Sequence, residues 1–163
     1  MRIALLTALI VVFDQATKYL AITKLKALQS IEVIPGFFNF SYVENPGAAW
    51  GIFGGQKYPL IIFALISLAY IIWKRKKLFG HLRFSTLLPA LICSGIIGNV
   101  IDRIRISRVI DFLDFHAFGK HFPSFNIADS AICIGAFLFI VAEFMYSRSQ
   151  KDLTPCINNE QRS

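Results

Sequence analysis

The chain has little charge: 17% of its 163 residues are Asp, Glu, Lys or Arg, against about 25% in an average soluble domain. It also lacks polar faces at helical spacing in its longest runs, since LIIFALISLAYIIW is apolar on every side. A soluble helical bundle needs such faces, so this class is disfavoured. With 55% hydrophobic residues, the composition instead favours a membrane protein.

Several chemical signatures are also missing. The chain has no G-x-S-x-G elbow and no phosphate-binding glycine loop, which disfavours serine and nucleotide chemistry. Its three cysteines show no paired or metal-ligand spacing. The histidines lie in different loops or too far apart for an H-E-x-x-H zinc site: His81, His116 and His121. We therefore expect no metal and no cofactor.

The basic residues decide how the net charge of +7 is interpreted. The densest cluster is Lys74 to Lys77, with Arg83 just beyond it, between two apolar runs. Such a cluster between membrane spans is typical of a cytoplasmic loop under the positive-inside rule. It therefore argues against a nucleic-acid partner.

Four apolar segments are each near the length needed to cross a bilayer, about 20 residues. We expect an all-α polytopic membrane protein, one domain over residues 1–148, with helices at about 3–22, 56–73, 84–104 and 124–146 and a polar, disordered cytoplasmic tail at 149–163. The first segment is alternatively a cleaved signal peptide. Asp14 and Lys18 interrupt it and no clean cleavage site follows, so we expect it to be retained.

With the 74–83 loop inside, both termini are expected to be cytoplasmic and residues 23–57 and 102–124 to lie outside. The first outer segment alternates partly and has turn signals at Pro35-Gly36 and Asn45-Pro46-Gly47. It predicts a small β-structured piece on the outer membrane surface, with an irregular loop as the alternative. Its aromatic residues suit that interface: Phe37, Phe38, Phe40, Tyr42 and Trp50.

Polar residues near the spans gather at one expected membrane face. Three pairs share a helical face at i,i+3 or i,i+4 spacing, and two aspartates follow the third span: Asp14 with Lys18, Asn99 with Asp102, Asn126 with Asp129, and then Asp111 and Asp114. Ionisable groups in a bilayer are costly, so they tend to pair or to mark function. Scattered snorkelling charges are not expected to gather in this way.

Some of these residues have purely structural interpretations. Asp14 and Lys18 can form an ion pair within one helix. Asp102 stands beside Arg103 and favours an ion pair or an interfacial anchor. Asn45 in the NPG sequence has a turn role as its structural interpretation, without any part in a site.

Asp111 and Asp129 differ because Asp111 is flanked by apolar residues and Asp129 has no basic residue within four positions. Two carboxylates in a partly desolvated site share one proton, because both cannot ionise easily. One can then accept a proton from water while the other donates one to a carbonyl oxygen, as in aspartic proteases. The pair therefore favours peptide hydrolysis, with separate structural roles as the alternative.

Five motifs occur in order along the chain: FDQATKYL (13–20), ENPGAAWGIF (44–53), SGIIGNVIDRI (94–104), VIDFLDF (109–115) and FPSFNIADSAICIG (122–135). Together they resemble the lipoprotein signal peptidase, or signal peptidase II, family. The resemblance covers nearly the whole chain apart from the tail. One departure is Ser94-Gly95, where the family often has two glycines.

The resemblance implies a bacterial inner-membrane aspartic endopeptidase, without a cofactor, that acts toward the periplasmic face. It implies cleavage of diacylglyceryl-modified prolipoproteins just before the lipidated cysteine, by a protein that contacts membrane lipids and is expected to be a monomer. Asp111 and Asp129 match the catalytic aspartates. The remaining matches support the site or line the substrate pocket: Asp14, Lys18, Asn45, Asn99, Asp102, Arg103 and Asn126.

Two other function classes stay open. In a small transporter or proton channel the same carboxylates relay ions, but acidic groups should then continue to the inner face, where the sequence has few. A non-catalytic membrane scaffold is the second alternative. For that class, replacement of both aspartates should have no functional effect.

Overall fold

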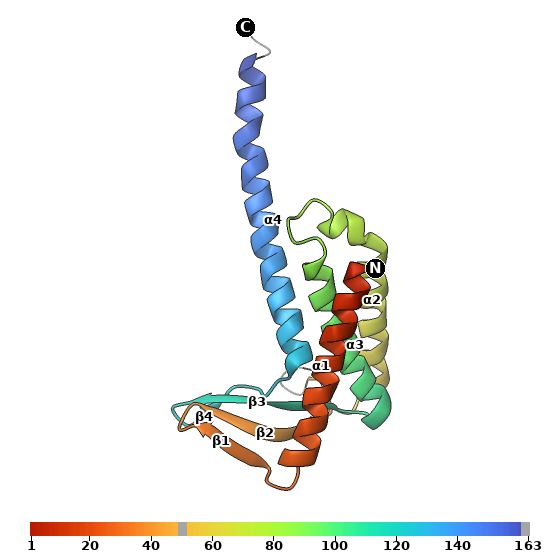
Figure 1. Cartoon of the computed structure of the whole chain (residues 1–163), viewed down its shortest axis with the longest axis vertical. Helices are drawn as coiled ribbons and strands as arrows, with labels where there is room; N and C mark the ends of the chain where they lie inside the picture. Colours follow the sequence, from red (N-terminus) through yellow and green to blue (C-terminus); the bar gives the residue numbers. More distant parts are fainter. Residues whose placement is uncertain (49–51, 161–163) are drawn as a thin grey trace.

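The computed structural model describes residues 1–48 and 52–160. In these residues the chain forms α1 (Arg2–Leu25), β1 (Ser30–Ile34), β2 (Phe38–Asn45), α2 (Lys57–Phe79), α3 (Leu87–Ile106), β3 (Val109–Ala117), β4 (Lys120–His121) and α4 (Ile127–Glu160). Each helix is long and apolar enough to cross a membrane. The predicted class, a four-span membrane protein with a small β-structured part, is confirmed. Figure 1 shows the helices as a bundle with the sheet at one end.

Helix α3 is the centre of the bundle and packs against α1, α2 and α4. Its glycines allow close approach: a Cβ at Gly95 would collide with the Ala128 carbonyl oxygen of α4, and one at Gly98 with the Asp14 carboxylate of α1. The Ser94 hydroxyl donates to the Leu91 carbonyl oxygen at 2.8 Å, within its own helix. The departure from two glycines therefore leaves this packing intact.

The outer surfaces of the other three helices are apolar. Large side chains such as Leu9 on α1, Phe63 on α2 and Phe137 on α4 are more than half exposed. In water such surfaces would be unfavourable, whereas in a bilayer they contact acyl chains. The chain is therefore a membrane protein, and its exposed apolar faces are the lipid-facing ones.

The sheet is antiparallel, with strand order β1-β2-β3-β4. The β1-β2 hairpin turns at Gly36, whose φ of 72° suits glycine, as the turn signal predicts. The strands β3 and β4 were not predicted, because the 102–124 segment was expected to be only a connection. Aromatic rings pack between strands on one face, with Phe38 and Phe115 centroids 4.6 Å apart. Trp50 lies outside the described residues.

The predicted helix boundaries differ from the observed ones by three residues or more at several ends, and most at the ends of α2 and α4. Helix α2 continues through the basic cluster to Phe79, because Lys and Arg are good helix formers and are favourable in a last turn. Helix α4 begins at Ile127, after Pro123 rather than around it, and continues to Glu160. The expected disordered tail is thus largely helical.

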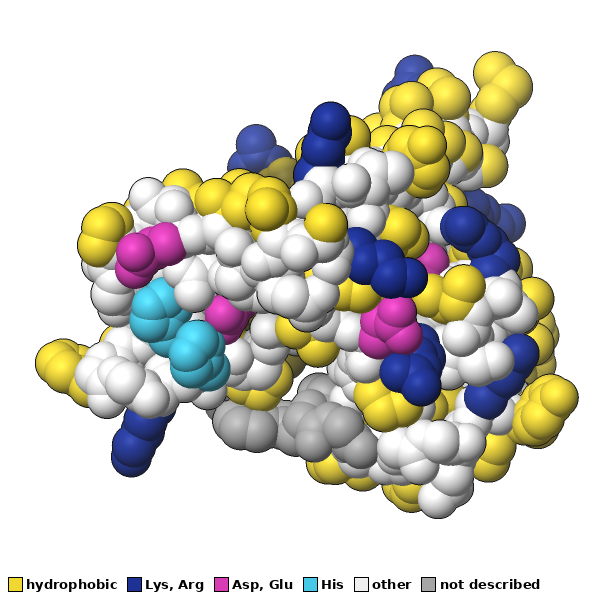
Figure 2. All heavy atoms as spheres, turned by 90° about the horizontal axis from the view of Figure 1, so that it is seen from below, with side chains coloured by type: hydrophobic (Ala, Val, Ile, Leu, Met, Phe, Trp, Pro, Cys, Tyr) yellow, Lys and Arg dark blue, Asp and Glu magenta, His cyan; other side chains and the backbone are white. Residues whose placement is uncertain are grey.

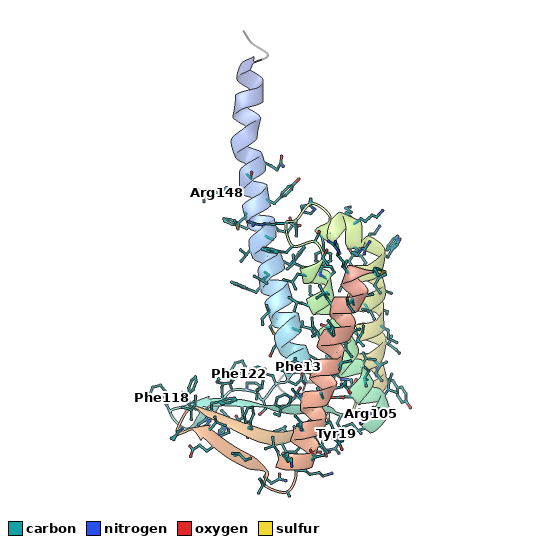
Figure 3. The ribbon with its side chains drawn as sticks, viewed as in Figure 1. Phe13, Tyr19, Arg105, Phe118, Phe122 and Arg148 are labelled. Atoms are coloured by element: carbon teal, nitrogen blue, oxygen red, sulfur yellow. The ribbon has the colours of Figure 1, made fainter. Side chains whose placement is uncertain are left out.

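The end of the bundle opposite the sheet holds the connection between α2 and α3, the N-terminus and the far part of α4 (Figure 1). Arg148, on α4, lies at this end in Figure 3, level with that connection. A shared end for these segments agrees with the predicted topology. Which membrane face each end occupies stays a prediction.

Candidate active site

Two carboxylates from separate elements line one cavity where α3, α4 and the sheet meet. Asp111 comes from β3 and Asp129 from the first turn of α4, and the cavity has a volume of about 370 Å³. Asp111 is 1% exposed, and Asp129 is partly buried. Three more predicted site residues line the cavity: Asn45, Asn99 and Arg103. The sequence did not indicate the other lining residues, which are Ala48, Val109, Phe122, Pro123, Ser124, Phe125, Ser130, Ile132 and Cys133.

Backbone pairing brings the two carboxylates together. Phe125 pairs with Leu113 of β3, giving hydrogen bonds of 3.1 Å and 2.9 Å between their backbones. This pairing fixes the chain just before α4 alongside the middle of β3. The next residue, Asn126, therefore lies beside Asp111, and α4 starts at once with Asp129 in its first turn.

Asn126 contacts both carboxylate residues. Its Nδ2 donates to Asp111 Oδ1 at 2.6 Å, and its Oδ1 accepts the backbone N–H of Asp129 at 2.9 Å. The second contact is an N-cap, in which a side-chain oxygen satisfies a free amide of the first helical turn. Asn126 was predicted within the fourth helix, but it precedes that helix as its cap.

Two further amides hold the carboxylates. Asn99 Nδ2 donates to Asp129 Oδ1 at 2.7 Å, and Asn45 Nδ2 donates to Asp111 Oδ2 at 3.0 Å. Asn45 Oδ1 also accepts from the Gly47 backbone N–H at 2.9 Å. Asn45 is thus both a turn residue and a partner of Asp111, so the two interpretations of this residue are compatible.

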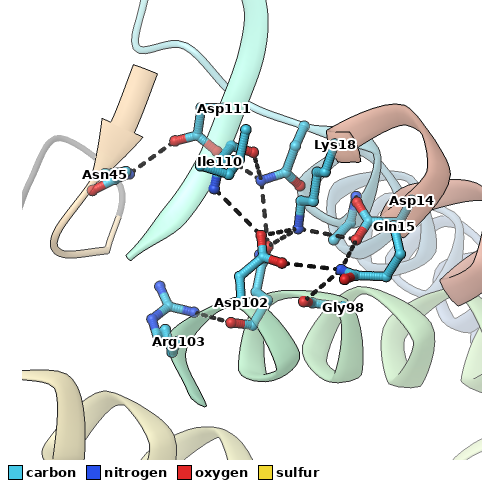
Figure 4. Close-up of polar contacts among 12 residues, drawn as sticks. Asp14, Gln15, Lys18, Asn45, Gly98, Asp102, Arg103, Ile110 and Asp111 are labelled. Carbon is cyan, nitrogen blue, oxygen red and sulfur yellow. Dashed lines mark hydrogen bonds and ion pairs between the residues drawn. The ribbon is translucent and has the colours of Figure 1, made fainter. Parts of the chain in front are cut away.

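A buried charge cluster supports these amides (Figure 4). Lys18 Nζ contacts Asp14 Oδ2 and Asp102 Oδ2, each at 2.9 Å, and donates to Asn99 Oδ1 at 3.0 Å. The expected pair within the first helix is present, but Lys18 also connects α1 to α3. Asp14 Oδ1 in turn accepts the Ala128 backbone N–H of α4 at 2.8 Å. The cluster therefore links three of the helices.

Asp102 does not pair with Arg103, so that interpretation is wrong. Adjacent residues on a helix point in different directions. Asp102 turns toward Lys18 and accepts the Ile110 backbone N–H at 3.3 Å, whereas Arg103 donates to the Gly47 carbonyl oxygen at 2.9 Å. Arg103 thereby holds the segment after β2 against the cavity.

Gln15 belongs to this cluster and was missed. Its Nε2 donates to Asp102 Oδ1 at 3.1 Å and to the Gly98 carbonyl oxygen at 3.2 Å, and its Oε1 accepts from Arg105 at 3.2 Å. Its position next to Asp14 on an otherwise apolar span was the available signal. A buried amide in a span needs partners as a carboxylate does.

The site raises the pKa of Asp111 to about 7. Burial is the largest cause, because it penalises the charged form, and the negative charge of Asp129 adds to it. The hydrogen bonds from Asn45 and Asn126 and the charge of Lys18 act in the opposite direction. A proton on the Asp111 side of the pair is therefore retained up to near-neutral pH.

Another group of side chains, on the outer face of the sheet, has the residue types of metal ligands. Asp114, His116 and His121 each offer one ligand atom, and these atoms lie within 4.8 Å of one another. The sequence has no H-E-x-x-H spacing, but the hairpin of β3 and β4 brings His116 and His121 together in a way that this spacing does not predict. His81 lies apart from them and pairs with Glu143 at the other end of the bundle.

Four helices long enough to span a membrane, with two carboxylates in one cavity between α3, α4 and the sheet, are the features of a membrane-embedded enzyme. The family model described as Signal peptidase (SPase) II matches residues 6–145. A lipoprotein signal peptidase of Staphylococcus aureus is 40% identical over 148 residues, 91% of each chain. One from Desulforapulum autotrophicum is 41% identical over 145 residues, 85% of this chain and 89% of that one.

Solved structures agree with these relatives. Two structures described as a bacterial membrane enzyme superpose with TM-scores of 0.74 and 0.73, at 38% and 39% identity. They match 91% and 86% of this chain, and 90% of their own chains in both cases. The chain belongs to the signal peptidase II family and is a peptidase.

Proposed function

We propose that this protein removes signal peptides from diacylglyceryl-modified prolipoproteins, with Asp111 and Asp129 as the catalytic pair. Cleavage falls just N-terminal to the lipidated cysteine. The supporting observation is that carboxylates from β3 and α4 line the same cavity and are held by amides rather than by cations. Family membership supplies the substrate class, since the relatives are lipoprotein signal peptidases.

The mechanism uses one shared proton. The ionised carboxylate takes a proton from a water molecule, whose oxygen attacks the scissile carbonyl carbon. The protonated carboxyl gives its proton to the carbonyl oxygen, and a tetrahedral diol forms. As the diol collapses and the C–N bond breaks, the pair gives its proton to the leaving nitrogen while one diol hydroxyl returns a proton to the ionised carboxylate, so that the pair again holds one proton. Because the pKa of Asp111 is raised to about 7, this carboxyl group still carries a proton near neutral pH, as these reaction steps require.

The surrounding polar residues position the reacting groups. Asn99 and Asn126 orient the carboxylates through hydrogen bonds of 2.7 Å and 2.6 Å, while Asn45 holds the second oxygen of Asp111. Arg103 lines the cavity and orients a substrate carbonyl or headgroup. Lys18, Asp14 and Asp102 act indirectly. Lys18 and its partner Asp102 hold Asn99, and Asp14 holds the first turn of α4.

The topology follows from the charge distribution. The basic cluster from Lys74 to Lys77, with Arg83, belongs to the connection at the end of the bundle away from the sheet, which supports a cytoplasmic location for that end and for both termini. The sheet and the cavity then face the periplasmic side of the bacterial inner membrane. A monomer is sufficient, because one chain supplies both carboxylates and the lipid-facing surfaces along which a lipidated substrate approaches.

A cleavage assay tests the proposal. Purified protein is given a diacylglyceryl-modified precursor and the same precursor without the lipid. We expect cleavage of the lipidated form only, and a loss of more than about 100-fold in rate for Asp111→Asn and for Asp129→Asn, in line with losses of acid–base groups. Glu143→Gln is the matched control, since this carboxylate of α4 lies at the other end and pairs with His81.

Each outcome has a clear consequence. Retained cleavage by either aspartate variant rejects the carboxylate mechanism. Equal cleavage of both precursors rejects the substrate class but leaves the mechanism standing. Ion transport by these carboxylates is disfavoured, because in the described residues the buried acidic groups all lie toward the sheet end: Asp14, Asp102, Asp111 and Asp114.

A further inference from the structure

Three side chains meet on the face of β3 that points away from the catalytic cavity. Asp114 and His116 are two residues apart on β3, so they project to the same side. His121 of β4 is the cross-strand partner of His116, and the two rings stack with centroids 4.9 Å apart. Figure 2, seen from the sheet end, shows histidine side chains beside acidic ones on this face.

The contacts within this group are incomplete. His121 Nδ1 lies 2.9 Å from Asp114 Oδ1, and Asp114 Oδ2 accepts from the Ser41 hydroxyl at 3.1 Å. His116 Nδ1, however, is buried without a hydrogen-bond partner. The only other such side-chain atom in the described residues is Asn39 Oδ1, and Asn39 is the cross-strand partner of Asp114.

Unpaired buried polar atoms are costly, at about 1–3 kcal/mol each. Cross-strand partners project to the same side of a sheet, so Asn39 shares the face of Asp114 and the histidines. Both unpaired atoms of the described chain therefore fall in one small patch, which otherwise holds two imidazoles and a carboxylate. A bound cation gives His116 Nδ1 a partner, whereas a hydrogen-bonded pair of Asp114 and His121 alone does not.

We propose that Asp114, His116 and His121 form a binding site for a divalent transition metal of the zinc type. Imidazole nitrogen and carboxylate oxygen are donors that zinc accepts. Ligand atoms at about 2.0–2.1 Å from a tetrahedral zinc lie about 3.3 Å apart. The observed separations, from 2.9 Å up to 4.8 Å, reach that value by rotation of His121, whose side chain is 59% exposed.

The site is distinct from the catalytic pair, although His121 and Asp111 both border one cavity beside the segment that follows β4. Asp111 and Asp114 are three residues apart on a strand, so their side chains project to opposite faces. The metal holds β4 to β3, and the chain leaving β4 passes directly to Phe122, Pro123 and Ser124, which line the catalytic cavity. Its role is to fix the segment that joins β3, which carries Asp111, to α4, which carries Asp129.

Zinc titration of the purified full-length protein tests this site. The protein is stripped with a chelator, titrated with Zn²⁺, and the bound metal is counted by elemental analysis after desalting. We expect one zinc per chain, with nitrogen and oxygen ligands in X-ray absorption. His121→Ala should weaken binding by more than about 10-fold, because loss of a residue that merely orients a ligand already costs about 10–100-fold.

His81→Ala is the matched control, since this histidine lies at the other end of the bundle beside Glu143. It should bind zinc like the unmodified chain, and thermal unfolding should show that both variants fold. No tight zinc binding by the unmodified protein overturns the proposal. Equal affinity in His121→Ala does so too, because the metal would then be held by cysteines or by the catalytic pair. So does loss of binding in His81→Ala.

Discussion

Asn126 donates a hydrogen bond of 2.6 Å to Asp111, although 15 residues separate them in the chain. The same side chain caps α4 through the backbone N–H of Asp129. The geometry of the pair thus depends on a residue that carries no charge. One side chain fixes the β3 carboxylate and the start of the helix that carries the other.

Replacement of Asn126 separates these two roles. Asn126→Ser keeps an N-cap oxygen but removes the amide donor, whereas Asn126→Ala removes both. We expect both variants to lose about 10- to 100-fold in kcat, since hydrogen bonds to charged groups contribute about 1.5–3 kcal/mol. Both variants lose the hydrogen bonds of the buried amide and should be less stable, but the Ala variant should lose about 0.5–2 kcal/mol more than the Ser variant, because it also lacks the cap. Full activity of Asn126→Ser would show that the contact with Asp111 is dispensable.

The raised pKa of Asp111 predicts the alkaline limit of activity. The pair needs one proton to donate, and Asp111 holds a proton up to a pKa of about 7. We therefore expect kcat to fall as the pH rises above about 7, by up to about tenfold per pH unit where a single proton is lost. The pH profile of kcat on the lipidated precursor checks this. An activity that rises steadily from pH 6 to pH 9 would contradict it.

Stability should follow the same group. The pKa of Asp111 in the folded protein is raised above its ordinary value of 3.8. Its contribution to the free energy of unfolding is therefore fully present below pH 3.8 and is lost as the pH rises through about 7. The thermal midpoint of the unmodified protein should therefore decrease between about pH 4 and pH 7. Asp111→Asn cannot ionise and should show a flatter dependence. Parallel curves for the two proteins would contradict this attribution.

Much of this arrangement was accessible from the sequence. Apolar runs of about 20 residues predict the four helices, and Asp111 and Asp129, each set among apolar residues, predict a carboxylate pair. The strand pairing of β2 with β3 was not accessible, because it depends on contacts about 70 residues apart that no local pattern encodes. Gln15 and the pairing of Lys18 with Asp102 were missed for the same reason, since both require knowing which face of α1 meets α3.

Lys18 should contribute strongly to stability. Its ammonium group has three partners, Asp14, Asp102 and Asn99, and its side chain is only 2% exposed. Lys18→Met leaves two buried carboxylates without a cation, which typically costs about 3–5 kcal/mol. We expect a marked fall in the thermal midpoint in detergent.

Two further variants check the cause. Lys24→Met removes an exposed lysine from the same helix and should change little. Adding Asp102→Asn to Lys18→Met removes one of the stranded charges and should restore part of the loss. If the double variant is less stable than Lys18→Met alone, the effect of Lys18 is not electrostatic.

Gly95 should limit how closely α4 approaches α3. A Cβ at this position would collide with the Ala128 carbonyl oxygen and would lie 2.5 Å from Ile132 Cγ1. A backbone oxygen cannot rotate away, so Gly95→Ala must push the first turn of α4, with Asp129, away from Asn99. We expect a destabilisation of about 1–3 kcal/mol, as for other overpacked sites, together with reduced kcat.

Ser94→Ala is the matched control, because it changes the adjacent buried residue without adding volume. Its stability and activity should stay close to those of the unmodified protein. Unchanged kcat in Gly95→Ala would mean that the 2.7 Å contact between Asn99 and Asp129 does not depend on this packing.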